Sequence, residues 1–278
     1  MELSADSAGR RFGRRAMVVV SLTALATFAF RASWTSAADR AAVRPADNLT
    51  FRPTVLLRQG STQGSGTVIA SADNDTLILT AAHVVDSDQP VVVELHRYNL
   101  GVESIKEREG WPRRVAARVV ARDPAADVAL VRIKGMTALP FVARLDLDTP
   151  TPERGTAVVS VGIDRGTDLN SWSSQVRGSI QLDMDRGGGN RPFLITSTPP
   201  EVGRSGGGLF RAADGLVIGV CVGRVEVREG RRVGVFASGA SIRRLLQESG
   251  LLDTVVAAQA RRKSLRPRVE TTRGGVAR

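Results

Sequence analysis

Three residues of this chain have the types and the order of a nucleophilic Ser-His-Asp set. His83, Asp127 and Ser205 follow one another at intervals of 44 and 78 residues. A serine hydroxyl becomes a strong nucleophile when an adjacent base accepts its proton and a third group orients that base. The set therefore indicates acyl transfer. The segments that contain these residues are Leu79–Val85, Asp123–Leu130 and Gly203–Leu209.

Other chemistries are limited by how few histidines and cysteines the chain has. Two histidines, His83 and His96, cannot build a metal site of several histidine ligands. The single Cys221 can form neither an internal disulfide nor a cysteine-based zinc site. We therefore expect no metal and no cofactor. His96 alternates with Leu95 in a β-rich run, so we predict an exposed strand residue rather than the base.

Glycines surround Ser205 in a pattern that suits acyl transfer. The backbone N–H groups of Gly203 and Ser205 are predicted to bind the developing oxyanion, because glycine permits the unusual dihedral angles of such a turn. Gly64 and Gly66 should similarly let a strand pass close under the site. The Gly-x-Ser-x-Gly pattern also occurs in α/β-hydrolases, but their histidine follows the serine, and here no histidine lies beyond His96.

The body of the chain is predicted to be all-β. Short runs rich in β-branched residues alternate with turn residues, which is typical of barrels and sandwiches. A linker with two prolines, Thr149–Glu153, divides the runs about evenly. We expect two six-stranded antiparallel β-barrels and one C-terminal helix over Ser241–Glu248, with Ser241 as its N-cap. The expected strands are Phe51–Leu57, Thr67–Ala70, Leu77–Thr80, Pro90–Leu95, Val115–Ala121, Val128–Ile133, Ala157–Val161, Val176–Leu182, Phe193–Thr196, Leu216–Val222 and Val233–Ala237.

The two ends of the chain differ from this body. An arginine-rich start, the 15-residue apolar stretch Ala16–Phe30 and small residues up to Ala38 predict a signal peptide that is cleaved after Ala38. We expect an exported protein, periplasmic or secreted, with an uncleaved membrane anchor as the alternative. The expected divisions are a signal peptide over 1–38, an N-terminal barrel over 39–148, a C-terminal barrel with its helix over 149–252 and a disordered basic tail over 253–278.

The net charge of +11 lies mainly at the ends. Residues 1–38 carry +3 and residues 254–278 carry +6, which leaves +2 for the remainder. A nearly neutral body argues against a nucleic-acid-binding face, so no nucleic-acid partner is expected. Membrane contact is expected only through an uncleaved signal or the basic tail.

The quoted segments together resemble a known family. Thr80–His83, Asp127–Leu130 and Gly203–Gly207 are similar to the signature segments of trypsin-like (chymotrypsin-fold) serine proteases. Gly64–Val68 and the absence of disulfides resemble the bacterial HtrA/Deg-like branch. The resemblance covers about residues 50–250, and too few residues follow it for the PDZ domain that many relatives carry.

The resemblance implies a role for each residue and a class of substrate. His83 would be the general base, Asp127 would orient it, and Ser205 would be the nucleophile of a serine endopeptidase. The implied fold is the chymotrypsin-like double barrel. Unfolded or extended polypeptides would be the substrates, and the implied role is protein quality control.

The sequence departs from the family pattern beside the nucleophile. Arg204 stands where the Deg-like branch commonly has Asn and trypsins have Asp, and Gly208 stands where proline is usual. An arginine cannot bind the amino terminus that zymogen cleavage frees, so that activation route is not expected. These departures leave open a second hypothesis, a catalytically weak or inactive protease fold that acts as a binding protein.

The substrate pocket is predicted from positions near the nucleophile. Pro199 lies six residues before Ser205, where trypsins place an acid, and Val220 and Val235 should line the opposite wall and the base. A pocket without charge disfavours a buried Lys or Arg side chain. We therefore expect cleavage after Val, Ala or Leu, with broad specificity.

Overall fold

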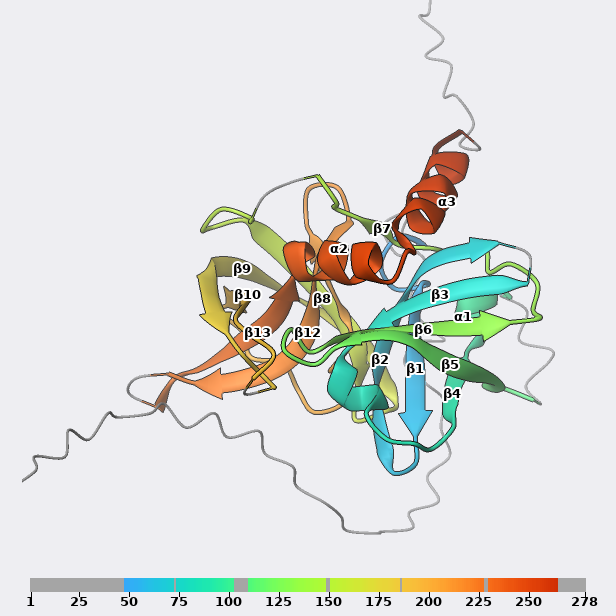
Figure 1. Ribbon diagram of the computed structural model, residues 1–278, viewed down its shortest axis with the longest axis horizontal. Helices are drawn as coiled ribbons and strands as arrows, with labels where there is room; N and C mark the ends of the chain where they lie inside the picture. Colours follow the sequence, from blue (N-terminus) through green and yellow to red (C-terminus); the bar gives the residue numbers. More distant parts are fainter. Residues whose placement is uncertain are drawn as a thin grey trace, which may run out of the picture.

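Two β-barrels side by side make up the protein (Figure 1). The predicted signal peptide and the last 14 residues of the predicted tail lie outside the described residues. Within the described ranges, no helix is both long and apolar enough to cross a membrane. The computed structural model describes residues 48–72, 74–102, 110–148, 151–185, 187–227 and 230–264.

The first barrel is closed by six antiparallel strands in the order β1-β2-β3-β6-β5-β4. Irregular pairing between β2 and β3 and between β5 and β6 bends these strands as closure requires. One face of each strand contributes to an apolar interior that includes Val55, Ile78 and Val131. The strands are β1 (Thr54–Gln59), β2 (Thr62–Ala72), β3 (Asp75–Thr80), β4 (Val91–Leu95), β5 (Arg113–Asp123) and β6 (Val128–Lys134).

The second barrel also has six antiparallel strands. β11 pairs with both β8 and β12, which closes the ring β8-β9-β10-β13-β12-β11. The prediction of two six-stranded barrels is thus confirmed, and each predicted strand overlaps an observed one. The strands are β8 (Ala157–Asp164), β9 (Asp168–Leu182), β10 (Arg191–Thr196), β11 (Gly208–Arg211), β12 (Leu216–Glu226) and β13 (Arg232–Ser238).

Two short strands were not predicted. β7 (Arg144–Leu145) comes before the linker, yet it pairs in parallel with β12 of the second barrel. β11 begins at Gly208, the last glycine of the run after Ser205, where the sequence analysis expected no strand. Neither strand contains a run of β-branched residues, which is the pattern that predicted the others.

The C-terminal region differs from the prediction. Helix α2 (Gly239–Glu248) begins after Ser238, so Ser241 is inside the helix and is not its N-cap. Helix α3 (Leu252–Ser264) occupies residues that were predicted to be a disordered tail, and that prediction is wrong for residues 253–264. The physical reason is burial: Val255 is fully buried, and the half-buried Leu252 packs against the same apolar cluster.

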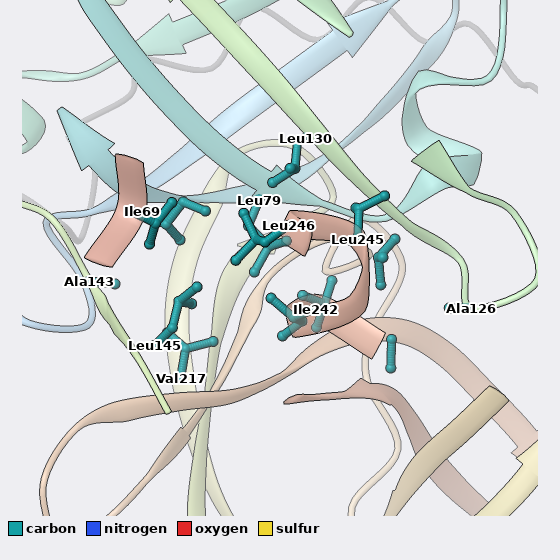
Figure 2. Packing of buried hydrophobic residues seen from close by; sticks show 14 of the residues in the cluster. Ile69, Leu79, Ala126, Leu130, Ala143, Leu145, Val217, Ile242, Leu245 and Leu246 are labelled. Atoms are coloured by element: carbon teal, nitrogen blue, oxygen red, sulfur yellow. The ribbon is translucent and has the colours of Figure 1, made fainter. Parts of the chain in front are cut away.

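That apolar cluster joins the two barrels. Ile69, Leu79 and Leu130 come from the first barrel, and Leu245 and Leu246 come from α2. Figure 2 shows these side chains pointing toward one another, with α2 between the two groups of strands. The shared core fixes one barrel against the other, so residues at the ends of strands from both barrels can form one site.

Candidate active site

His83 and Asp127 are held together by strand pairing. β3 pairs with β6 up to Thr80 and Ala129, so the residues just after β3 lie beside those just before β6. His83 lies in a single 3-10 turn, η3 (Ala82–Val85), and Asp127 directly precedes β6. The distance from His83 Nδ1 to Asp127 Oδ2 is 2.6 Å, and the His83 backbone N–H donates to Asp127 Oδ1 at 2.9 Å. One carboxylate therefore fixes both the ring and the backbone of His83.

Asp127 lies at the end of a tight turn that the second barrel supports. Its φ is 52°, a left-handed conformation that is uncommon for residues other than glycine but more frequent for Asp. The Asp123 carboxylate accepts the N–H of Ala126 at 3.2 Å within this turn, and it also pairs with Arg191 of β10 at 2.8 Å. The N–H of Met184 donates to the Ala125 carbonyl at 3.1 Å. The loop before β10 thus braces the turn that carries Asp127.

The pKa of His83 is raised above its ordinary value of 6.5. Burial alone would lower it, but the hydrogen bond to Asp127 and the negative charges of Asp127 and Asp86 together outweigh burial. The side chain is 44% exposed, so its other ring nitrogen has room to meet a substrate or a hydroxyl group.

Ser205 is placed at the junction by backbone bonds from both barrels. The N–H of Ser65, in β2, donates to the Ser205 carbonyl at 2.7 Å, and the N–H of Gly206 donates to the Cys221 carbonyl at 2.7 Å. A Cβ at Gly64 would lie 2.5 Å from Val84 Cγ2 and 2.8 Å from the Ser205 carbonyl oxygen. The turn with His83 and the turn with Ser205 therefore both contact Gly64, as the predicted close strand passage requires.

The Ser205 hydroxyl itself is bonded to the second barrel. It donates to the Val222 carbonyl at 3.3 Å, which is long for an O–H···O bond. Across the residues that the structure describes, no hydrogen bond joins Ser205 to His83. The structure thus pairs two of the three predicted residues directly and brings the third to the same junction.

The predicted oxyanion donors lie in a turn whose peptide planes are fixed. Gly203 has a φ of 93°, where a side chain would be strained and its Cβ would lie 2.6 Å from the Arg165 nitrogen. The Val202 carbonyl accepts the N–H of Arg165 at 2.7 Å. Because N–H and C=O point in opposite directions across a trans peptide, the N–H of Gly203 faces away from Arg165. Neither this amide nor that of Ser205 has a hydrogen-bond acceptor in the described part of the chain.

Ser65 is a site residue that sequence analysis missed. It is fully buried, its hydroxyl donates to the Gly203 carbonyl at 3.1 Å, and it accepts the N–H of Ile163 at 2.8 Å. Its own carbonyl accepts the Thr80 hydroxyl at 2.7 Å. A polar residue between Gly64 and Gly66 was the only signal for this role, because its partners are remote in the sequence.

The predicted pocket residues have different surroundings. Val220 and Val235 are each 1% exposed and belong to the apolar cluster between the barrels. Pro199 is half-buried in the loop that leads from β10 to Gly203. Their role as pocket walls stays a prediction.

His96 lies outside the site. It was predicted as an exposed strand residue, but it is a half-buried N-cap of the short helix α1 (Arg97–Leu100), and its N–H donates to Asn99 Oδ1 at 2.7 Å. Burial lowers the pKa of His96, although the charge of Glu94 opposes this effect. His96 is therefore a capping residue, and His83 is the one histidine at the junction.

Comparisons with known proteins agree with this arrangement. Residues 64–220 match the family model described as "Trypsin-like peptidase domain". A Do-like protease of Arabidopsis thaliana is 32% identical over 180 residues, which cover 63% of this chain and 38% of that protein. A protein of Marinomonas sp. (strain MWYL1), named as a DegP-like periplasmic serine endoprotease, is 31% identical over 64% of this chain and 33% of its own length. This chain thus spans about a third of the length of these relatives.

A solved structure shares the fold. The active form of the Rv3671c protease from M. tuberculosis superposes with a TM-score of 0.58, over 74% of this chain and 84% of that chain, at 23% sequence identity. At this level of identity the likeness shows a common double-barrel architecture.

Proposed function

Because the chain belongs to the trypsin-like peptidase domain family, we propose that it is a serine endopeptidase with His83, Asp127 and Ser205 as its catalytic triad. The observation that carries this proposal is the double contact of Asp127 with His83, through ring and backbone, at the junction that holds Ser205. This contact leaves the outer ring nitrogen as the base and fixes the ring orientation.

The proposed reaction has two halves. The Ser205 hydroxyl exchanges its bond to Val222 for one to His83 Nε2, and His83 takes the proton as Ser205 Oγ attacks the scissile carbonyl carbon. The amides of Gly203 and Ser205 bind the oxyanion. His83 then gives the proton to the leaving amine as the C–N bond breaks. Water, activated by the same base, hydrolyses the acyl-enzyme and restores Ser205.

An extended polypeptide is the substrate that the site favours. β12 pairs with β11 only as far as Val220, whereas its pairing with β13 continues to Glu226. Among the described residues, no strand pairs with the other edge of β12 beyond Cys221, so an unfolded chain could add there as a strand beside Ser205. Folded domains present few such segments, so unfolded or extended chains are the proposed partners.

A peptide-library digest tests this function together with the proposed pocket. Mass spectrometry of the products should show cuts after Val, Ala or Leu, because Pro199, Val220 and Val235 provide no charge for Lys or Arg. The Ser205→Ala variant should give no cuts. Cuts mainly after Arg or Lys would contradict the pocket, and cuts by the Ser205→Ala preparation would assign the activity to a contaminant.

The pH dependence should follow His83. Only neutral His83 can accept a proton, so kcat/KM should rise with pH through an apparent pKa above 6.5, because the pKa of His83 is raised. An NMR titration of the imidazole measures this directly. The pKa should fall in Asp127→Asn, which removes a charge and an acceptor, and less in Asp86→Asn, which removes only a charge. A larger fall in Asp86→Asn would contradict the assigned cause.

We also propose export, supported by the signal-like pattern of residues 1–38 and by the periplasmic relative. Mass spectrometry of the N-terminus of the protein from its native host should find a chain that starts near Asp39. An intact Met1 on a membrane-bound form would contradict cleavage.

A further inference from the structure

Arg204 is a fully buried arginine next to the proposed nucleophile. Among the described residues, it is the largest side chain that is fully buried. The family resemblance gives it no role, since it stands where other residues are usual. A buried guanidinium is costly unless all its donors are bonded, so its partners show what it does.

Both strands of one hairpin bind the guanidinium. Nε donates to Asp164 Oδ1 at 2.9 Å and Nη2 to Asp164 Oδ2 at 2.8 Å, which is a two-point ion pair at the end of β8. Nη1 donates to the Ser160 carbonyl at 3.0 Å, and Nη2 also contacts Asn170 Oδ1 of β9. The ring of Trp172 lies 5.5 Å from the guanidinium carbon. The cation is therefore bonded on every side and held in one orientation.

The backbone of Arg204 connects the two proposed oxyanion donors. The N–H of Ser205 belongs to the peptide unit that follows Arg204, and the unit that precedes Arg204 joins it to Gly203, so a rotation of the Arg204 backbone would turn the Ser205 amide and shift it relative to Gly203. The stem of Arg204 packs closely against Gly162 of β8, since a Cβ at Gly162 would lie 2.7 Å from Arg204 Cγ. The side chain thus ties the turn to the β8–β9 hairpin, and the Ser65 hydroxyl contacts β8 beside it.

We propose that Arg204, through its ion pair with Asp164, is a positioning residue that holds the Gly203–Ser205 turn with both amides aimed at the oxyanion. This inference rests on the proposed function and adds to it that an internal ion pair, rather than a newly freed amino terminus, keeps the turn formed. Buried ion pairs contribute little net stability compared with apolar pairs of similar volume. The pair therefore serves mainly to orient the Gly203–Ser205 turn rather than to stabilise the fold.

The test uses variants that remove the pair without leaving one charge buried. In the double variant Arg204→Met/Asp164→Leu, kcat should fall by about 10²-fold or more, as for loss of an oxyanion donor, with little change in KM. The affinity for a peptide boronic acid, whose adduct with Ser205 mimics the tetrahedral intermediate, should fall in proportion to kcat/KM. Binding of an uncleaved peptide, measured in a Ser205→Ala background, should not change.

A matched control is available in the same barrel. Arg211 pairs with the buried Asp146 at 2.7 Å, away from the Gly203–Ser205 turn, so the double variant Arg211→Met/Asp146→Leu should leave kcat unchanged. A folded Arg204→Met/Asp164→Leu variant with the kcat of the wild type would overturn the proposal. A loss confined to KM would also overturn it.

Hydrogen exchange separates this proposal from the proposed function. If the wild type hydrolyses no peptide, the proposed function is contradicted. The positioning role of Arg204 is then tested by the rate of amide exchange in residues 200–208. The Arg204→Met/Asp164→Leu variant should exchange faster there than the wild type while the thermal midpoints of the two proteins stay close. Equal rates of amide exchange in the two folded proteins would overturn the positioning role of Arg204.

Discussion

Replacing Ser205 by alanine is expected to lower kcat by about 10⁴-fold or more, because it removes the proposed nucleophile. The fold should survive, since the lost hydroxyl makes one long hydrogen bond, 3.3 Å to the Val222 carbonyl. We expect a change in the free energy of unfolding within about 1 kcal/mol. Steady-state kinetics and urea denaturation of the same preparation measure both.

The other two members of the triad should behave as parts of the same unit. His83→Ala and Asp127→Asn should each lower kcat strongly. Double variants that combine two of the three changes should have no lower kcat than Ser205→Ala alone. His96→Ala is the matched control, because His96 caps α1 and takes no part in the site. Full activity in His83→Ala, or its loss in His96→Ala, would show that the base is wrongly assigned.

The second large effect is expected at Gly206. Its φ is 84°, and a Cβ there would lie 2.1 Å from the Ser65 carbonyl oxygen and 2.2 Å from Thr80 Oγ1. Neither atom can move freely, because the two are hydrogen-bonded to each other. Gly206→Ala should therefore cost about 3 kcal/mol or more of stability and should also reduce kcat, since it pushes the Ser205 turn away from the first barrel.

A control variant separates the strain of the backbone from the steric clash. Gly155 has a similar φ of 91°, but no atom lies within 4 Å of the Cβ that alanine would add. Gly155→Ala should cost only the left-handed strain, about 1–2 kcal/mol, and leave kcat unchanged. Equal losses of stability in Gly155→Ala and Gly206→Ala, measured by urea denaturation, would contradict the close packing of the Ser205 turn against β2.

Most of the fold was predicted from short runs rich in β-branched residues that turn residues separate. Strands such as β1 and β6 are short apolar runs, buried along almost their whole length and bounded by turn residues, so the two barrels could be predicted. The helix α3 could not, because its burial depends on residues of β2 and α2 that are distant in the sequence. Only Val255 and a few half-buried neighbours make its apolar face, and the basic residues that follow them resemble a solvated tail.

The sequence suggested candidate residues for the site but not the residues that support them. His83, Asp127 and Ser205 stand in short local patterns, whereas Arg204 acts through Asp164, 40 residues away in the sequence. From the sequence alone, Arg204 was a departure that favoured a weak or inactive protein. In the structure it is bonded on all sides, so the departure is a different way to hold the same turn. No local pattern could show this, because the partner belongs to another strand.

The most direct test of an activated Ser205 is covalent labelling by a fluorophosphonate, which reacts rapidly only with a serine that an adjacent base has activated. Peptide mapping of the labelled protein should place the adduct on Ser205. His83→Ala should abolish rapid labelling, and His96→Ala should not change it. Rapid labelling of another residue, or none in a folded wild-type protein that is tested above the pKa of His83, would contradict the account.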